Sequence, residues 1–257
     1  MMGCFRLVLA LVVMQAHATE PGNHYALANT AVLIFYALSS YGCTAAMQGK
    51  YKGQPLLFMG SRYLRLWPSY LATFALSSVA WVAFDDLYKI TMPTGLAWWG
   101  HLLMVYHPPG RLIAPAWVLP WMLLGYVVIT FGASGTARRS LAWLAVSFAW
   151  AQHQAFLLSW GEYYGSAAAW SLAYSVGAAA YWMPVEVPRA SGWAGVIAFP
   201  IFLSHYLVLS VLRSLGLIPG WPLFFVALPP TLALSWLLVV AVERPIARYR
   251  QSLRRTP

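Results

Sequence analysis

Long apolar runs recur along the whole chain, and they constrain its fold more than any other feature. They lie at 5–19, 26–47, 66–84, 113–132, 140–160, 165–184, 193–214 and 221–242. A helix that crosses the bilayer needs about 20 mostly apolar residues with few charges. With 61% of its residues hydrophobic and 9% charged, the chain has too little polar surface for a soluble domain. We therefore predict an all-α, polytopic transmembrane helix bundle with about eight full spans.

Two segments need a separate interpretation. The stretch 94–107 is apolar but too short to cross comfortably, so we predict a re-entrant or partly embedded helix there. The start of the chain resembles a signal peptide, because Arg6 precedes an apolar run that ends in Ala16-His17-Ala18. Its single basic residue abuts the apolar run, which argues against cleavage, and we expect this segment to remain as the first span.

The basic residues predict how the chain is oriented, because cytoplasmic loops of membrane proteins are enriched in Lys and Arg. With the N-terminus inside, 13 of the 16 basic residues fall on the cytoplasmic side. Both termini are then cytoplasmic, provided that 94–107 does not cross, and we expect 1–257 to form one integral membrane domain. The basic residues lie in short clusters between apolar runs, which favours membrane topology over nucleic-acid binding.

Metal and disulfide chemistry are not indicated by the sequence. Cys4 and Cys43 are the two cysteines, and we expect both to be buried, inert thiols. The histidines are scattered without an HExxH pattern, so no metal site is predicted.

Arg6 and His17 form the first candidate site. They are eleven positions apart, which is three helical turns plus about 20 degrees, so both side chains face one way about 16 Å apart. Ionisable groups at membrane depth are costly and usually functional, which makes His17 a candidate general base. The alternative is a hydrogen-bonded histidine at an interface, without a chemical role.

Arg62 and Arg65 form the second candidate site, at the cytoplasmic entry to the third span. Residues at i and i+3 share a helix face. Two guanidinium groups there suit a phosphate-bearing ligand, because each can bind phosphate oxygens with two parallel hydrogen bonds. The alternative is that both arginines anchor the helix to lipid headgroups.

His205 lies well inside an apolar span, directly after Ser204. Adjacent residues do not face each other on a helix, which argues against a nucleophile and base pair. We predict a packing or substrate-positioning role for His205.

Taken together, these elements resemble the acyltransferase 3 family of integral membrane proteins, which includes O-acetyltransferases of bacterial polysaccharides. The motifs that carry the resemblance follow the family's order: Arg6 and His17 as its first-helix Arg and His, Phe35-Tyr36-Ala37-Leu38-Ser39-Ser40-Tyr41 as "FFxLSGY", Arg62-Tyr63-Leu64-Arg65-Leu66-Trp67-Pro68 as "RxxRxxP", Ala116-Trp117-Val118-Leu119 as "WxL", Phe202-Leu203-Ser204-His205 as "hxLxH", and Glu243-Arg244-Pro245 as "ExP". The resemblance covers nearly the whole chain.

The resemblance implies an enzyme of the bacterial inner membrane that moves an acetyl group from cytoplasmic acetyl-CoA to a sugar hydroxyl. The acceptor would be a cell-surface or exported glycan or a lipid-linked saccharide, and no further cofactor is implied. His17 would be the catalytic base and Arg6 its partner, while Arg62 and Arg65 would hold the donor's phosphates. Ser39, Trp117 and His205 would position substrate. We expect the membrane domain to act alone or with a partner.

Two positions depart from the family pattern. Ser40 stands where the family often has Gly, and Met122 stands near where it commonly has a Glu after "WxL". The loss of that carboxylate keeps a second function open, namely a non-catalytic membrane subunit of a glycan-export system. A transporter is the other alternative, although the inverted repeats typical of transporters are not visible by eye.

Overall fold

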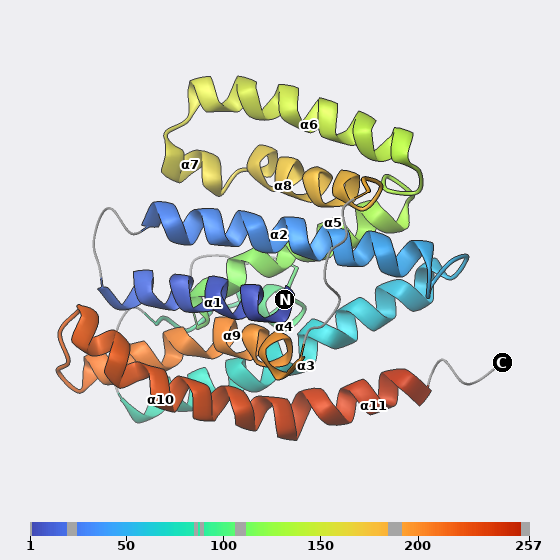
Figure 1. Cartoon of the computed structure of the whole chain (residues 1–257). Helices are drawn as coiled ribbons and strands as arrows, with labels where there is room; N and C mark the ends of the chain where they lie inside the picture. Colours follow the sequence, from blue (N-terminus) through green and yellow to red (C-terminus); the bar gives the residue numbers. More distant parts are fainter. Residues whose placement is uncertain are drawn as a thin grey trace. The chain divides into compact units, whose positions relative to one another are not determined.

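The computed structural model describes residues 2–19, 25–84, 87, 90–105, 112–184 and 192–252, and within these ranges it contains helices and turns but no strand (Figure 1). In chain order the elements are α1 (Met2–Thr19), α2 (Tyr25–Gln48), α3 (Pro55–Ala83), α4 (Ala97–Leu102), η1 (Ala114–Trp117), α5 (Val118–Thr130), α6 (Ala137–Leu157), α7 (Trp160–Tyr164), α8 (Ala167–Ala180), α9 (Gly192–Ser214), α10 (Trp221–Leu238), the π-helical η2 (Val239–Glu243) and α11 (Arg244–Ser252). The all-α prediction is confirmed.

Among the described residues, four helices are long and apolar enough to cross a membrane. They are Ala26–Gln48, Pro55–Ala83, Gly192–Ser214 and Trp221–Ser252. The apolar helices Gly3–Thr19 and Ala114–Thr130 are shorter, and α6 and α8 cover the two remaining predicted spans. The structure therefore supports four spanning helices by length and composition, and the total of eight spans stays a prediction.

Two helices extend beyond the apolar runs that predicted them. α3 begins at Pro55 rather than near residue 66, so Arg62 and Arg65 lie within the helix and not at its entry. Proline suits the first position of a helix, and the Leu, Met and Arg residues that follow are good helix formers. The last helix likewise continues from α10 through η2 and α11 to Ser252. Glu243 therefore lies within this continuous helix and not after its end.

The predicted re-entrant segment 94–107 contains the six-residue helix α4. A helix of that length spans about 9 Å, far less than the hydrocarbon core. Residues 106 and 107 lie outside the described residues, and the embedding of this segment stays a prediction.

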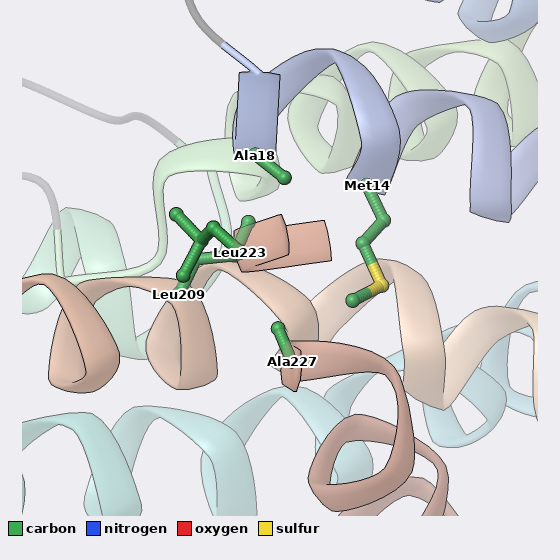
Figure 2. Close-up of a cluster of buried hydrophobic side chains, with 5 residues drawn as sticks. All are labelled: Met14, Ala18, Leu209, Leu223 and Ala227. Carbon is green, nitrogen blue, oxygen red and sulfur yellow. The ribbon is translucent and has the colours of Figure 1, made fainter. Parts of the chain in front are cut away.

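The described helices group into two compact units, which we describe separately. Unit 1 takes its residues from Met1–Ala28, Tyr63–Pro120 and Pro188–Pro257. Its core includes a cluster in which α1 packs against α9 and α10. Figure 2 shows the five buried side chains of this cluster, Met14, Ala18, Leu209, Leu223 and Ala227. The two alanines let the helix backbones approach closely, as small residues do between membrane helices.

Unit 2 takes its residues from Asn29–Arg62 and Trp121–Val187. Within it α6 packs along α8, as Figure 1 shows. The Ser147 and Ser171 hydroxyls lie 2.8 Å apart between these helices, and the indole N–H of Trp143 donates to the Ser171 hydroxyl at 3.1 Å. The division into two units does not test the prediction of a single membrane domain.

The two cysteines differ in exposure. Cys43 is buried, as predicted, but Cys4 is exposed, so the prediction of two buried thiols is wrong for Cys4. Cys4 lies in the first turn of α1, where the apolar side chains of Phe5 and Val8 are also exposed, so this part of the helix does not face the core.

Candidate functional site

His17 lies in the last turn of α1, where two aromatic rings of α9 contact it. Its imidazole stacks on that of His205, with ring centroids 5.4 Å apart and planes inclined by 29°. The Tyr206 ring meets it edge-on at 5.3 Å. Two histidines that the sequence analysis treated separately are thus in direct contact within unit 1.

His205 is fully buried, and its contacts fix the state of its ring. Nδ1 lies 3.0 Å from the carbonyl oxygen of Ile201, and a carbonyl can only accept, so Nδ1 carries the hydrogen. Nε2 is then an acceptor, and among the described residues no group hydrogen-bonds to it. The neighbouring Ser204 turns to α10, where its hydroxyl lies 3.0 Å from that of Ser235. Ser204 and His205 therefore do not form a pair, as their adjacency predicted.

Arg213, which was not among the predicted site residues, holds the end of α1. Its Nη2 donates to the backbone carbonyl of His17 at 2.7 Å and lies 3.4 Å from that of Ala18. The backbone N–H of Gly220 also donates to the Ala18 carbonyl, at 3.0 Å. The last carbonyls of a helix have no partner inside it, so these donors complete the helix end.

A pocket rich in arginine lies elsewhere in unit 1, with a cavity volume of about 490 Å³. Its charged lining comes from three segments far apart in the sequence, in α1, in α3 and at the end of the last helix. The ionisable residues that line it are Arg6, Arg65, Glu243, Arg244 and Arg250. Four positive charges against one negative charge make this pocket suited to an anion.

Glu243 is the one acidic residue among those lining the pocket, and several groups interact with its carboxylate. The Ser69 hydroxyl donates to its Oε1 at 3.2 Å, and Arg65 and Arg250 interact with it electrostatically. Glu243 ends the π-helical segment Val239–Glu243, a local widening that is frequent at functional sites. The guanidinium of Arg244 lies 5.1 Å above the Trp236 ring.

The pocket brings together two of the predicted site residues, Arg6 and Arg65. Arg62 is not among its lining residues. Arg62 belongs to unit 2, where its guanidinium lies over the Phe58 ring at 5.2 Å. Its predicted part in donor binding stays a prediction.

The remaining predicted positioning residues are divided between the units. Trp117 ends η1, which packs against α9 in unit 1. Ser39 lies in unit 2, with its hydroxyl 3.5 Å from that of Tyr126. The Tyr174 hydroxyl donates to the backbone carbonyl of Met122 at 3.3 Å, so Met122 contributes its backbone to unit 2.

Some of the residues at these sites were not predicted, although the sequence contained a signal for them. Glu243 stood in the quoted "ExP" motif, although only the fold shows that the carboxylate faces arginines. Tyr206 and Arg213 are seven positions apart, which is two turns less about 20 degrees, so they share a face of α9. An arginine inside an apolar run was the signal for Arg213.

Within the described ranges, no group of three or more His, Cys, Asp or Glu side chains is close enough to hold a metal ion. The prediction that catalysis needs no metal stays a prediction. Comparisons with protein-family models, with curated proteins and with solved structures find no match to this chain.

Proposed function

We propose that this protein is a membrane O-acyltransferase that moves an acetyl group from acetyl-CoA to a sugar hydroxyl of a cell-surface or exported glycan. The observation that carries the proposal is the arginine-lined pocket of unit 1. Arg6, Arg65, Arg244 and Arg250 converge there from α1, α3 and α11. Guanidinium groups bind phosphate oxygens with two parallel hydrogen bonds, so the lining suits a donor with several phosphate groups.

The proposed base is His17, which shares α1 with the pocket residue Arg6. The two positions are separated by about 16 Å along the helix axis. A donor bound at the pocket must therefore carry its acyl group on a long arm, which a coenzyme A thioester does. The sequence resemblance to acyltransferase 3 proteins assigns the same two residues.

In the proposed reaction His17 removes the proton of the acceptor hydroxyl as the oxygen attacks the thioester carbonyl carbon. The new carbon–oxygen bond forms as the carbon–sulfur bond breaks. The coenzyme A thiolate leaves with the electron pair and takes the proton from the imidazolium. The thioester is already reactive, so binding the two substrates in the correct orientation supplies much of the remaining acceleration. The Nε2 acceptor of His205, stacked beside His17, is available to orient a hydroxyl.

The membrane topology is part of the same proposal. We propose eight spans in the inner membrane of a bacterial cell, with both termini in the cytoplasm. Arg138 lies in the first turn of α6 and Glu162 lies just beyond its end, in α7, so the two would then lie on opposite sides. Single cysteines at these two positions, in a chain without Cys4 and Cys43, should label from opposite faces of sealed vesicles. Labelling from one face would remove α6 from the spans.

A non-catalytic membrane subunit is the second candidate function. The observation that favours it is Met122, which stands where the family commonly has a Glu. Such a subunit would need neither donor binding nor a base.

The proposal is tested by measuring acetyl-CoA binding to the purified full-length chain in detergent. We expect Arg65→Ala to weaken binding by roughly tenfold or more, because a hydrogen bond to a charged group contributes about 1.5–3 kcal/mol. Arg65→Lys keeps the charge but loses the planar fork, so it should recover little. Arg138→Ala is the matched control, because this exposed arginine lies outside the pocket and should leave binding unchanged.

Each outcome separates the candidate functions. Weaker binding in Arg65→Ala but not in Arg138→Ala supports the donor site. Equal binding by all variants, or full recovery with Arg65→Lys, would show that Arg65 does not bind phosphate through its fork. No acetyl-CoA binding by the wild-type chain would favour the non-catalytic subunit.

A further inference from the structure

The end of α1 is held by donors from α9 and from the turn that precedes α10. Arg213 donates to the His17 carbonyl at 2.7 Å, and the N–H of Gly220 donates to the Ala18 carbonyl at 3.0 Å. These carbonyls carry the partial negative charge of the helix end, so a cation beside them is favourable. In an apolar environment unpaired carbonyls would be costly, which makes these two contacts important for the last turn of α1.

Arg213 is nearly buried, with 8% of its surface exposed. Charged side chains in apolar helices are expensive and usually have a function. Arg213 also lies outside the arginine-lined pocket, because it is not among the pocket's lining residues. Its role therefore differs from that of Arg6 and Arg65.

The α9 helix holds His17 at two points. His205 and Tyr206 contact the imidazole ring, and Arg213 contacts the backbone carbonyl of the same residue. Tyr206 and Arg213 share one face of α9, and helical side chains lean toward the N-terminus of their helix. The imidazole ring of His17 therefore lies nearer the N-terminus of α9 than the backbone carbonyl of His17 does. Tyr206 can then contact the ring while Arg213 contacts the carbonyl.

We propose that Arg213 is a positioning residue that fixes the imidazole of His17 by capping the end of α1. For its effect on acyl transfer this inference rests on the proposed function, but the effect on His17 itself does not. Without the cap, the last turn of α1 loses its partner and the ring loses its fixed orientation against α9. A displacement of about 1 Å can lower a rate by roughly 100-fold.

The test measures the reactivity of His17 in the purified full-length protein. Histidine rings are modified with diethyl pyrocarbonate, and the rate at each histidine is read from peptide masses. His153 is exposed on α6 in unit 2, so it serves as the internal reference. The variants are Arg213→Met, which keeps an apolar stem without donors, and Arg213→Lys, which keeps a charged donor.

Ser235→Ala is the matched control for packing. It removes the contact between the Ser204 and Ser235 hydroxyls, which also joins α9 to a neighbouring helix of unit 1 but does not involve His17. We expect the modification rate of His17 relative to His153 to rise at least severalfold in Arg213→Met. It should stay near the wild-type rate in Ser235→Ala, and Arg213→Lys should retain most of the protection.

Transfer of labelled acetyl from acetyl-CoA to the glycan fraction of membranes supplies the second readout. Arg213→Met should lower kcat by roughly 10- to 100-fold while the KM for acetyl-CoA changes little, because Arg213 lies outside the pocket. A general loss of structure would instead lower both the kcat and the amount of folded protein.

The inference is overturned if His17 reacts at the wild-type rate in folded Arg213→Met. If that variant does not fold, Arg213→Gln, which is shorter and uncharged, replaces it under the same criterion. Equal exposure of His17 in the Lys and Met variants would show that the charged donor has no part, which also overturns it. If wild-type protein transfers no acetyl group, the proposed function fails, whereas a raised His17 reactivity would still support the cap.

Discussion

The two units bury different kinds of polar side chain. Apart from tyrosines, the buried polar residues described in unit 2 are all Ser or Thr, whereas unit 1 also buries His101, His205 and Arg213. Hydroxyl pairs such as Ser147 and Ser171 join neighbouring helices at modest energetic cost. Ionisable groups cost far more in an apolar environment and usually have a function. This difference agrees with the proposed function, in which unit 1 holds the base and the donor pocket and unit 2 serves mainly as a helix scaffold.

If unit 1 holds the proposed base, the largest effect on acetyl transfer is expected at His17. His17→Ala should lower acetyl transfer by roughly 10²- to 10⁴-fold, the usual contribution of a general base. Binding of acetyl-CoA should persist, because His17 is not among the residues that line the arginine pocket. Transfer kinetics and donor binding are measured on the same preparation.

Unchanged transfer in well-expressed His17→Ala protein would exclude His17 as the base. A mature N-terminus at Thr19 would have the same consequence, because it removes Arg6 and His17.

The helices were largely predictable because their apolar runs are local in sequence. The convergence of side chains was not, because it depends on which helices pack together. His17 and His205 are 188 positions apart, and nothing in the spacing of either shows that their rings stack. The pocket was predictable only in part. Arg6, Arg65 and Arg244 lay in the quoted motifs, but the sequence does not show that they and Arg250 line one pocket.

Boundaries were the least predictable part of the fold. The apolar run that predicted the third span omitted 55–65, where charged residues lower the mean hydropathy although the backbone stays helical. The same effect concealed the continuation of the last helix through Glu243 to Ser252. Hydropathy marks the apolar part of a helix, whereas hydrogen bonding and propensity set its ends.

A scaffold change in unit 2 gives the next largest effect. A Cβ added at Gly177 of α8 would overlap the backbone carbonyl of Ala37 on α2, so Gly177→Ala should force these helices apart. Overpacking of this kind costs about 1–3 kcal/mol. The thermal midpoint in detergent should fall, while diethyl pyrocarbonate modification of His17 stays at the wild-type rate.

Gly192→Ala is the control, because an added Cβ there meets nothing within 4 Å. If Gly177→Ala exposed His17 as strongly as Arg213→Met does, the division of roles between the units would be wrong.

A smaller effect is expected at Glu243. Its carboxylate interacts electrostatically with Arg65 and Arg250, so it competes with an anionic donor for the same cations. Glu243→Gln should tighten acetyl-CoA binding by roughly two- to fivefold, as expected for ion pairs of up to about 1 kcal/mol. Titration calorimetry measures this, and weaker binding would show instead that Glu243 orients the arginines.

The smallest effect concerns Glu162 in unit 2. The hydroxyl of Ser159 donates to its carboxylate at 2.7 Å and the Ser159 backbone N–H at 2.9 Å, and these bonds lower the pKa of Glu162 below its ordinary 4.5. A lowered pKa in the folded state stabilises the protein above the unfolded pKa, and the stabilisation is lost as the pH falls through the folded value. As the pH is lowered below about 4.5, the thermal midpoint of Glu162→Gln should therefore fall less than that of the wild type. Identical pH profiles would show that the contact contributes nothing.

Acetyl transfer to a glycan hydroxyl is the central claim, and the most direct measurement of it follows a labelled acetyl group from acetyl-CoA into the glycan fraction of membranes. Membranes with the wild-type chain, with His17→Ala and without the protein are compared, and mild alkali separates O-acetyl esters from alkali-stable N-acetyl groups. The predicted result is alkali-labile label with the wild-type chain and only background label in the other two. Equal alkali-labile label in all three would contradict the account.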